Sequence, residues 1–191
     1  MTVTSDLDRL HSQLSKLGDI FPGYVMEIVE GCIVMNPVKP FHGKTIQRVW
    51  GLLEDQLSAE WSVVSDVAFP FDDVNEFCPD LAVIPAAEED ANQGAYPADL
   101  IELVAEVVSP ESVRRDYEIK AQRYASRGIP NYLIFDPLKG HVVTLWNPGP
   151  KGYRGRDTIV YGPELTVDSP LGKLRIDTGR LPIDPKARPQ A

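Results

Sequence analysis

The residues best suited to chemistry are two carboxylates, Asp80 and Glu106, on either side of a polar loop. The flanking segments 80–84 and 100–108 are strand-like, and the loop at 86–99 is polar with Gly and Pro. If the two strands form a hairpin, its centre falls near the middle of this loop. The two carboxylates then face each other across adjacent strands, with Cβ atoms ~5 Å apart.

Like charges directly opposite each other are destabilising unless one is neutralised or a cation binds between them. Mg²⁺ prefers one or two carboxylates together with waters and phosphate oxygens, so the pair suits Mg²⁺ or Mn²⁺. Glu106 also interrupts the apolar run LIELVAEVV, and a carboxylate in a central strand is costly unless it is paired or binds a metal. Two simpler interpretations stay open: Asp80 caps a strand after Pro79, and Glu106 belongs to a structural ion pair.

A helix expected at residues 110–128 follows the Glu106 strand closely enough to pack over it. Asp116 and Lys120 are four residues apart and share one face, which Tyr124 extends by a turn. Lys120 is therefore placed to reach the metal site, where it would orient or deprotonate water or stabilise a phosphate's growing charge. By spacing alone, Asp116 and Lys120 equally suit a surface salt bridge.

The same helix is locally basic. Residues 112–128 hold five basic and two acidic side chains, a local charge of +3 in a chain of net charge -9. We expect four arginines to contact a phosphate backbone: Arg114, Arg115, Arg123 and Arg127. The alternative is an ordinary solvated helix face. The overall acidity gives no general attraction to nucleic acid or to anionic membranes.

The remaining pattern predicts an α/β (α+β mixed) fold, with a central mixed β-sheet flanked by helices and an extra N-terminal helix and hairpin. We expect helices at 5–17, 41–59 and 110–128, and strands at 24–29, 32–35, 61–69, 79–85, 100–108, 132–135, 142–146, 158–161, 165–168 and 174–176. Residues 182–191 read as an extended tail.

Length and composition indicate one domain over residues 1–191. The chain of 191 residues is 43% hydrophobic and 25% charged, which is typical of globular proteins. We expect a cytoplasmic protein, because there is no apolar run of membrane-spanning length and no secretory signal, and two cysteines make no disulfide framework. The sequence has neither GxxxxGK[ST] nor GxGxxG, so no nucleotide cofactor is expected.

Three segments, PDLAVIP, LIELVAEVVSPES and RRDYEIKAQRYASRGIPNYLIFDP, resemble the Uma2 family of restriction endonucleases within the PD-(D/E)XK nuclease superfamily. The opening hairpin YVMEIVEGCIVMNP and the following His42 are similar to that family as well. The resemblance runs from about residue 24 to 176. It implies a restriction-endonuclease-like core with the metal site at the hairpin of strands 80–84 and 100–108.

The resemblance also implies residue roles. Asp80 and Glu106 match the family's acidic metal ligands, and Val107 would add its backbone carbonyl. The superfamily's usual Lys two residues after the Glu is replaced here by Val108, and Lys120 on the next helix stands in for it. Supporting positions are Glu27, His42, Ser109, Asp116 and Tyr124. His42 by itself reads more simply as a solvent-facing helix-start residue, and Cys32 departs from the acidic residue often found after the hairpin Gly.

Taken together, these features lead us to expect an endonuclease that uses Mg²⁺ or Mn²⁺ to hydrolyse phosphodiester bonds of nucleic acid, with DNA as the expected polymer. The resemblance alone suggests a homodimer. Two alternatives remain: a non-catalytic binding or scaffold module on a nuclease fold, and a hydrolase of a small phosphorylated substrate, which an acidic surface tolerates more easily than long DNA.

Overall fold

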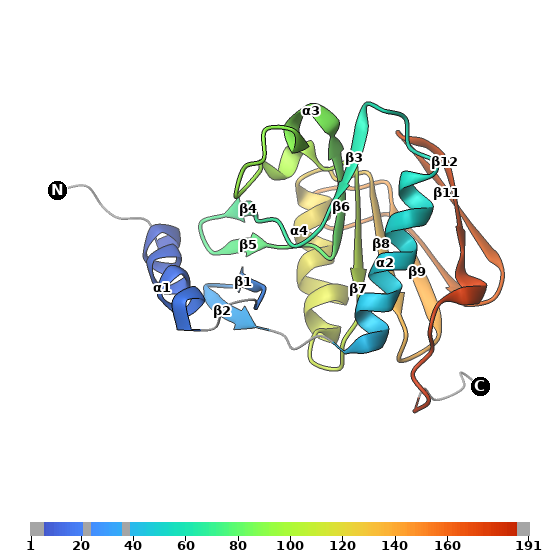
Figure 1. Ribbon diagram of the computed structural model, residues 1–191, viewed down its shortest axis with the longest axis horizontal. Helices are drawn as coiled ribbons and strands as arrows, with labels where there is room; N and C mark the ends of the chain where they lie inside the picture. Colours follow the sequence, from blue (N-terminus) through green and yellow to red (C-terminus); the bar gives the residue numbers. More distant parts are fainter. Residues whose placement is uncertain (1–5, 21–23, 36–38, 187–191) are drawn as a thin grey trace.

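The computed structural model describes residues 6–20, 24–35 and 39–186, and a six-stranded mixed sheet lies at its centre (Figure 1). The strand order is β10-β9-β8-β7-β6-β3. Neighbouring strands are antiparallel except β7 and β8, which are parallel. The bounds are β3 Trp61–Val64, β6 Leu81–Pro85, β7 Leu103–Val107, β8 Asn131–Asp136, β9 His141–Trp146 and β10 Gly155–Val160.

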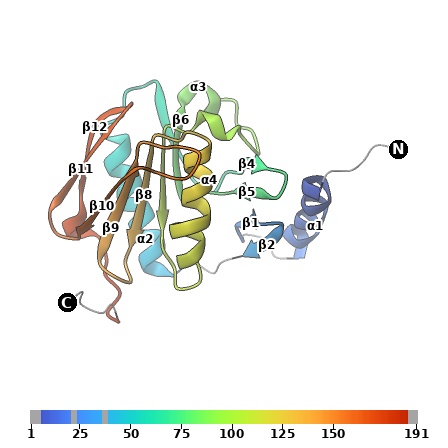
Figure 2. The same cartoon turned by 180° about the vertical axis from the view of Figure 1, so that it is seen from behind.

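Helices cover both faces of this sheet. α2, Pro40–Glu54, lies on one face, and a continuous helix made of η2 (Arg115–Lys120) and α4 (Ala121–Ser126) lies on the other (Figures 1 and 2). The η2 segment is a π-helix, whose i→i+5 hydrogen bonds widen the turn. This helix forms the crossover that joins the parallel strands β7 and β8.

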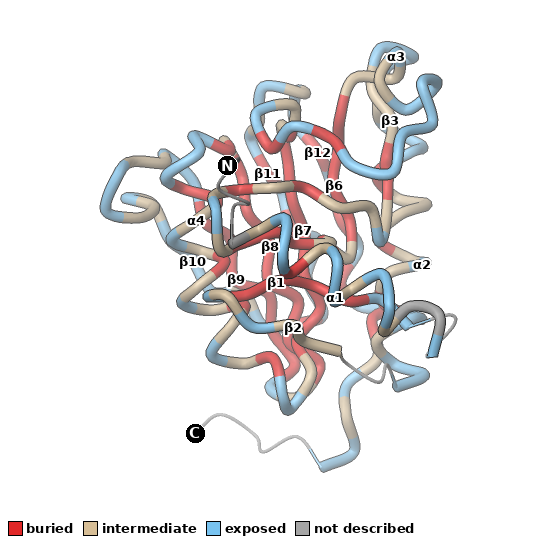
Figure 3. The backbone as a smooth tube through the Cα atoms, turned by 90° about the vertical axis from the view of Figure 1, so that its left-hand side faces the viewer, coloured by how far each residue is buried: buried red, intermediate tan, exposed pale blue. Residues whose placement is uncertain are grey.

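Each face of the sheet carries its own hydrophobic cluster, because side chains alternate along a strand. On β7, Ala105 packs with Val49 on the α2 side, whereas Val104 packs with Tyr124 on the α4 side. The same alternation directs Glu106 toward Tyr124. Figure 3 shows that β6, β7 and β8 are buried, so the Glu106 side chain belongs to a strand in the interior of the fold.

A second, four-stranded sheet packs on the α4 side, and a separate hairpin packs on the α2 side. The four-stranded sheet has the order β2-β1-β5-β4, with β1 Met26–Val29, β2 Cys32–Met35, β4 Phe69–Asp72 and β5 Asn75–Phe77. The hairpin consists of β11 Glu164–Ser169 and β12 Gly172–Asp177. The other helices are α1 Asp6–Ile20, α3 Ala86–Glu89, η1 Ala98–Leu100 and η3 Thr178–Arg180. No helix in the described part of the chain is long and apolar enough to cross a membrane.

Local sequence explains why the elements that position the site begin and end where they do. Glu30 and Gly31 join β1 to β2 with φ values of 49° and 75°. Two consecutive positive φ values define the type I′ turn that matches the twist of a hairpin. Pro40 opens α2 at a position where its missing N–H costs nothing. After α4, Gly128 adopts a φ of 78° and ends the helix.

The mixed-sheet architecture expected from the sequence is confirmed, but several boundaries differ. The strand expected at 61–69 is wrong as one element, because the chain turns at Asp66, with φ of 58°, and passes from the six-stranded to the four-stranded sheet. The strand expected at 100–108 begins only at Leu103, since η1 precedes it. The helix expected at 41–59 ends at Glu54, and the loop at 86–99 contains α3.

The expected extended tail only partly falls within the structure. Its first residues lie against the body of the protein: Asp184 N–H donates to the Pro137 carbonyl, and Ile183 packs against Gly140. Residues 187–191 lie outside the described part of the chain.

Candidate active site

Asp80 and Glu106 lie opposite each other at the end of the β6–β7 pair. Leu81 is opposite Ala105 in this antiparallel pair, and one further step along the register brings Asp80 opposite Glu106. A hydrogen bond ties the two ends together, because Val107 N–H donates to Asp80 Oδ2 over 2.6 Å. The antiparallel register expected for the two strands is therefore confirmed.

Glu106 is buried and held by the crossover helix. It is 3% exposed. Lys120 Nζ donates to its Oε1 over 2.7 Å, and the Tyr124 hydroxyl donates to the same oxygen over 2.6 Å. Burial raises the pKa of Glu106 well above its usual value, and the nearby Asp80 charge adds to this, although Lys120 opposes it. A cation that binds beside this carboxylate would stabilise its charged form.

Lys120 lies between two carboxylates that come from different sheets. Its Nζ is 2.7 Å from Glu106 Oε1 and 2.7 Å from Glu27 Oε1 on β1. Burial lowers the pKa of Lys120, but the two carboxylates outweigh it and the net shift is strongly upward. Glu27 is fixed in turn, because its Oε1 accepts the Cys78 N–H over 2.9 Å. The Lys120 ammonium group is therefore held in a fixed position beside Glu106, the candidate metal ligand.

His42 does not face solvent, and the simpler interpretation of this residue is wrong. Its Nε2 lies 3.0 Å from Asp80 Oδ1, and the side chain is only 12% exposed. Burial lowers the pKa of His42, but its hydrogen bond with Asp80 and the Asp80 charge outweigh burial and raise it overall. The first turn of α2 thus holds one oxygen of the Asp80 carboxylate, while Val107 N–H holds the other.

Asp116 is buried at the site and does not form the surface salt bridge that its spacing also allowed. It is 2% exposed, and the Ser112 hydroxyl donates to its Oδ2. Burial raises the pKa of Asp116 to about 6, against the opposing effects of Lys120, Ser112 and Arg115. The wide π-turn carries both Asp116 and Lys120 inward on the cleft side.

These residues line a cleft of about 600 Å³ between β1, α2, the ends of β6 and β7, and η2. Several of its buried polar atoms make no hydrogen bond within the described residues: His42 Nδ1, Ser109 Oγ and Asp116 Oδ1. Buried polar atoms are nearly always paired with protein, water or a bound group. The cleft therefore offers acceptors and donors to a ligand that enters it.

The donors of this cleft fit a hard divalent cation. The carboxylates of Asp80 and Glu106 face each other. Lys120 and Tyr124 both donate their hydrogen bonds to Glu106 Oε1, and Asp116 Oδ1 lies in the same cleft. Within residues 6–20, 24–35 and 39–186, no group of three or more His, Cys, Asp and Glu side chains is arranged to hold a metal ion. Mg²⁺ does not need such a cage, because it keeps several waters and takes one or two carboxylates plus phosphate oxygens.

The four arginines expected to contact nucleic acid all pair with acidic side chains. Arg114 lies 3.6 Å from Glu30 and 3.7 Å from Glu118. Arg123 lies 3.1 Å from Asp72, and Arg127 lies 3.6 Å from Asp99. Arg115 lines the cleft with a side chain 11% exposed, 3.5 Å from Glu27 and 3.6 Å from Asp116. The local charge of +3 is thus largely compensated by acidic residues from other elements.

The sequence did not point to two further residues that line the cleft or support it. Asp66 lines the cleft, and burial followed by the Asp80 charge raises its pKa. Ser112 holds both Asp116 and the Ser109 N–H. A signal for Asp66 did exist, since an Asp that interrupts an apolar run is a candidate for the αL conformation.

Comparison with known proteins agrees with this geometry. A family model, Uma2, described as "Putative restriction endonuclease", matches residues 12–179. No curated protein matches the chain. A solved structure from Anabaena variabilis, described as "a putative nuclease belonging to DUF820", shares the fold with a TM-score of 0.60 and 15% identity, covering 76% of this chain and 81% of that one. The expected resemblance is confirmed, and the chain belongs to the Uma2 family of restriction-endonuclease-like proteins.

Proposed function

We propose that this protein is a metal-dependent endonuclease that hydrolyses phosphodiester bonds of nucleic acid, with DNA as the polymer. The single observation that supports this most is the facing pair Asp80 and Glu106 with the Lys120 ammonium 2.7 Å from Glu106. Two carboxylates and one amine around an accessible cleft are the groups that phosphodiester hydrolysis needs. Membership of the Uma2 family and the nuclease fold point to the same reaction.

In this proposal Asp80, Glu106 and the backbone carbonyl of Val107 hold Mg²⁺ or Mn²⁺. Enzymes with restriction-endonuclease-like folds generally use divalent metal ions. When bound, the ion would polarise a phosphoryl oxygen and lower the pKa of a bound water. The chain's own contribution is to orient the ligands: His42 and Val107 N–H hold Asp80, and Lys120 and Tyr124 hold Glu106.

Lys120 is proposed to act as a fixed positive charge beside the scissile phosphate. It lies within 2.7 Å of both Glu27 and Glu106. A cation between two anions is held in its charged form, and a fixed charge stabilises negative charge that develops on phosphate oxygens. Asp116 and Ser109 are proposed to bind water or the metal's solvent shell, because each offers a buried oxygen without a hydrogen-bond partner in the described residues.

The choice of DNA as the substrate depends on the charges around the cleft. Arg114, Arg123 and Arg127 are ion-paired, but those pairs are partly exposed, and exposed pairs are weak enough for a phosphate to displace a carboxylate. The compensated charge and the net charge of -9 favour the second candidate, a hydrolase of a small phosphorylated substrate. Comparing cleavage of plasmid DNA with hydrolysis of mononucleotides separates the two.

The direct test is cleavage of supercoiled, linear and single-stranded DNA with Mg²⁺ or Mn²⁺. Wild type should cleave at least one of these, and Glu106→Gln should lose at least 100-fold in rate, because Gln keeps the shape but not the charge. Glu118→Gln is a control with the same chemical change, since Glu118 lies on the crossover helix with a side chain 70% exposed. Equal cleavage by wild type and Glu106→Gln, or a metal-independent reaction, would contradict the proposal.

The homodimer expected from the family remains a prediction. Two sites facing two strands would allow a double-strand break from one encounter. Sedimentation equilibrium of the purified protein tests it, and a monomer at micromolar concentration would count against it.

A further inference from the structure

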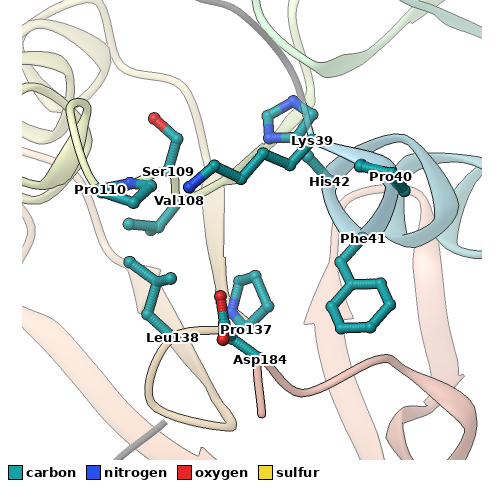
Figure 4. A pocket seen from close by; sticks show the side chains of 10 residues that line it. All are labelled: Lys39, Pro40, Phe41, His42, Val108, Ser109, Pro110, Pro137, Leu138 and Asp184. Atoms are coloured by element: carbon teal, nitrogen blue, oxygen red, sulfur yellow. The ribbon is translucent and has the colours of Figure 1, made fainter. Parts of the chain in front are cut away.

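A second pocket lies beside the catalytic cleft and has a different character. It has a volume of about 280 Å³. Its walls come from the start of α2, the segment after β7, the turn after β8 and the C-terminal segment (Figure 4). Most of its lining is apolar: Phe41, Val108, Pro110, Pro137 and Leu138. A space of this size accommodates one ring system rather than a stretch of polymer.

A few polar groups lie at the edge of this apolar pocket. Lys39 extends along one side toward Ser109, and the Asp184 carboxylate lies beside Pro137 (Figure 4). Lys39 is exposed and forms no ion pair with any described residue. Ser109 Oγ is buried and makes no hydrogen bond within the described residues. The pocket thus combines flat apolar walls, a donor cation and a carboxylate acceptor.

The pocket adjoins the proposed catalytic cleft, because His42 and Ser109 line both. His42 is the residue that binds Asp80 Oδ1 over 3.0 Å, so the pocket begins one side chain away from the proposed metal ligand. A group in the pocket would therefore belong to the nucleotide next to the phosphate in the cleft.

We propose that this pocket receives a nucleobase of the substrate strand, turned out of its stack beside the scissile phosphate. This inference rests on the proposed function, since it places a part of the same substrate. Phe41, which is 37% exposed, offers the aromatic face on which a base stacks. Pro137 and Leu138 line the pocket beside the Phe41 ring (Figure 4). Lys39 would bind the adjoining phosphate, and Asp184 would accept a hydrogen bond from the base edge.

Charge favours a nucleotide over the other occupants of an apolar pocket. An apolar peptide side chain would offer no partner to Ser109 Oγ, which is buried without a hydrogen bond within the described residues, and such a group is unfavourable when it stays unpaired. A nucleotide supplies a phosphate for Lys39 and ring amino groups for Asp184. The pocket's position beside the cleft also gives an acidic protein a way to hold a strand by stacking rather than by surface charge, which its net charge of -9 disfavours.

The first test is binding of deoxynucleoside 5′-monophosphates to the full-length protein, compared with deoxyribose 5-phosphate and inorganic phosphate, by isothermal titration. We expect at least one mononucleotide to bind about 10-fold more tightly than deoxyribose 5-phosphate, since one stacked base contributes this order of affinity. Equal binding of the mononucleotides and deoxyribose 5-phosphate would overturn the proposal, because it would show a phosphate site without a base site.

Variants locate the effect. Phe41→Leu should remove the preference for the base, and Phe41→Trp should retain it. The matched control is Val160→Ala, an exposed apolar truncation on β10. An unchanged base preference in Phe41→Leu would overturn the proposal.

The outcome is distinguishable from failure of the proposed function. Glu106→Gln removes a proposed metal ligand but lies outside this pocket's lining, so it should keep the base preference while losing cleavage. A protein that binds bases at Phe41 without cleaving DNA would support the pocket and contradict the endonuclease. Cleavage of DNA by a protein that shows no base preference would support the endonuclease and contradict the base pocket.

Discussion

The Glu27 carboxylate binds the Lys120 ammonium over 2.7 Å, although Glu27 comes from the opening hairpin and Lys120 from the crossover helix. The hairpin is therefore part of the site and not an appendage to the nuclease core. Because Lys120 also binds Glu106 over 2.7 Å, one side chain joins the four-stranded sheet to the central sheet at the proposed metal ligand.

Replacing Glu27 by Gln should slow catalysis without abolishing metal binding. Lys120 loses one of its two anions, so its ammonium is held less firmly beside the phosphate. We expect kcat on DNA to fall about 10- to 100-fold while the Mn²⁺ dissociation constant changes by less than about 3-fold, because one positioned charge contributes on this scale. Parallel titration and cleavage assays measure both. A variant with wild-type kcat would show that the hairpin plays no positioning role.

Removing Lys120 should destabilise the protein in a pH-dependent way. In Lys120→Met, Glu27 and Glu106 remain buried without their cation, which costs about 3–5 kcal/mol at neutral pH. Glu106, whose pKa burial already raises, relieves this cost by taking up a proton, so the loss relative to wild type should shrink as the pH falls from 8 to 5. Urea unfolding at pH 8 and pH 5 tests this. A loss of equal size at both values would indicate a packing effect rather than uncompensated charge.

Asp116 should lower the stability of the metal-free protein at neutral pH. Burial raises its pKa from 3.8 to about 6, so the folded state holds this proton more tightly than the unfolded chain does. Stability is therefore lost as the pH rises between these values, by about 3 kcal/mol in all. Asp116→Asn should unfold at a higher temperature than wild type above pH 6, and the difference should vanish below pH 4.

The same substitution should reduce cleavage, since Asn cannot replace the charge at the cleft. Thermal unfolding across pH 3.5–8 with EDTA, followed by a cleavage assay, measures both effects. An Asn variant that is less stable than wild type at pH 7.5 would contradict this assignment of Asp116. Ser112→Ala serves as a control, because it removes the hydroxyl that binds Asp116 and keeps the carboxylate.

If DNA is the substrate, the exposed arginines should contribute to affinity through phosphate contacts. Arg114 is 70% exposed and pairs with Glu30 and Glu118 at 3.6 and 3.7 Å. Arg114→Gln should weaken DNA binding uniformly across sequences and lower the slope of log affinity against log salt by about 1. Fluorescence anisotropy over a range of salt concentrations tests it. An unchanged slope would leave the arginine as part of a surface ion-pair network only.

The sequence predicted the register of the β6–β7 pair better than it predicted the boundaries of the elements around it. Loop length alone set Asp80 opposite Glu106, because an antiparallel pair with a symmetric loop has one natural register. The break at Asp66 was missed, since the segment 61–69 is apolar on both sides of it and only tertiary packing distributes it over two sheets. The β4–β5 hairpin was missed as well, although Phe69, Phe71 and Phe77 show the alternation of a strand pair.

Long-range contacts explain the rest. The Glu27–Lys120 pair spans two sheets, and no spacing rule relates residues so far apart in sequence. His42 was expected in solvent because a helix start is usually exposed, yet the end of β6 brings Asp80 within 3.0 Å of it. The π-turn at Arg115–Lys120 gives no sequence signal of its own, although π-turns are frequent at functional sites.

The most direct test of the central claim is isothermal titration of Mn²⁺ into wild-type protein, with Glu106→Gln and Glu118→Gln alongside, each in the absence and presence of a DNA duplex. The duplex matters because Mg²⁺-type ions take phosphate oxygens as ligands. The proposal predicts binding to wild type and to Glu118→Gln, and a loss of at least 10-fold in affinity in Glu106→Gln. Identical binding to all three proteins, or none to wild type even with DNA present, would contradict a metal centre at Asp80 and Glu106.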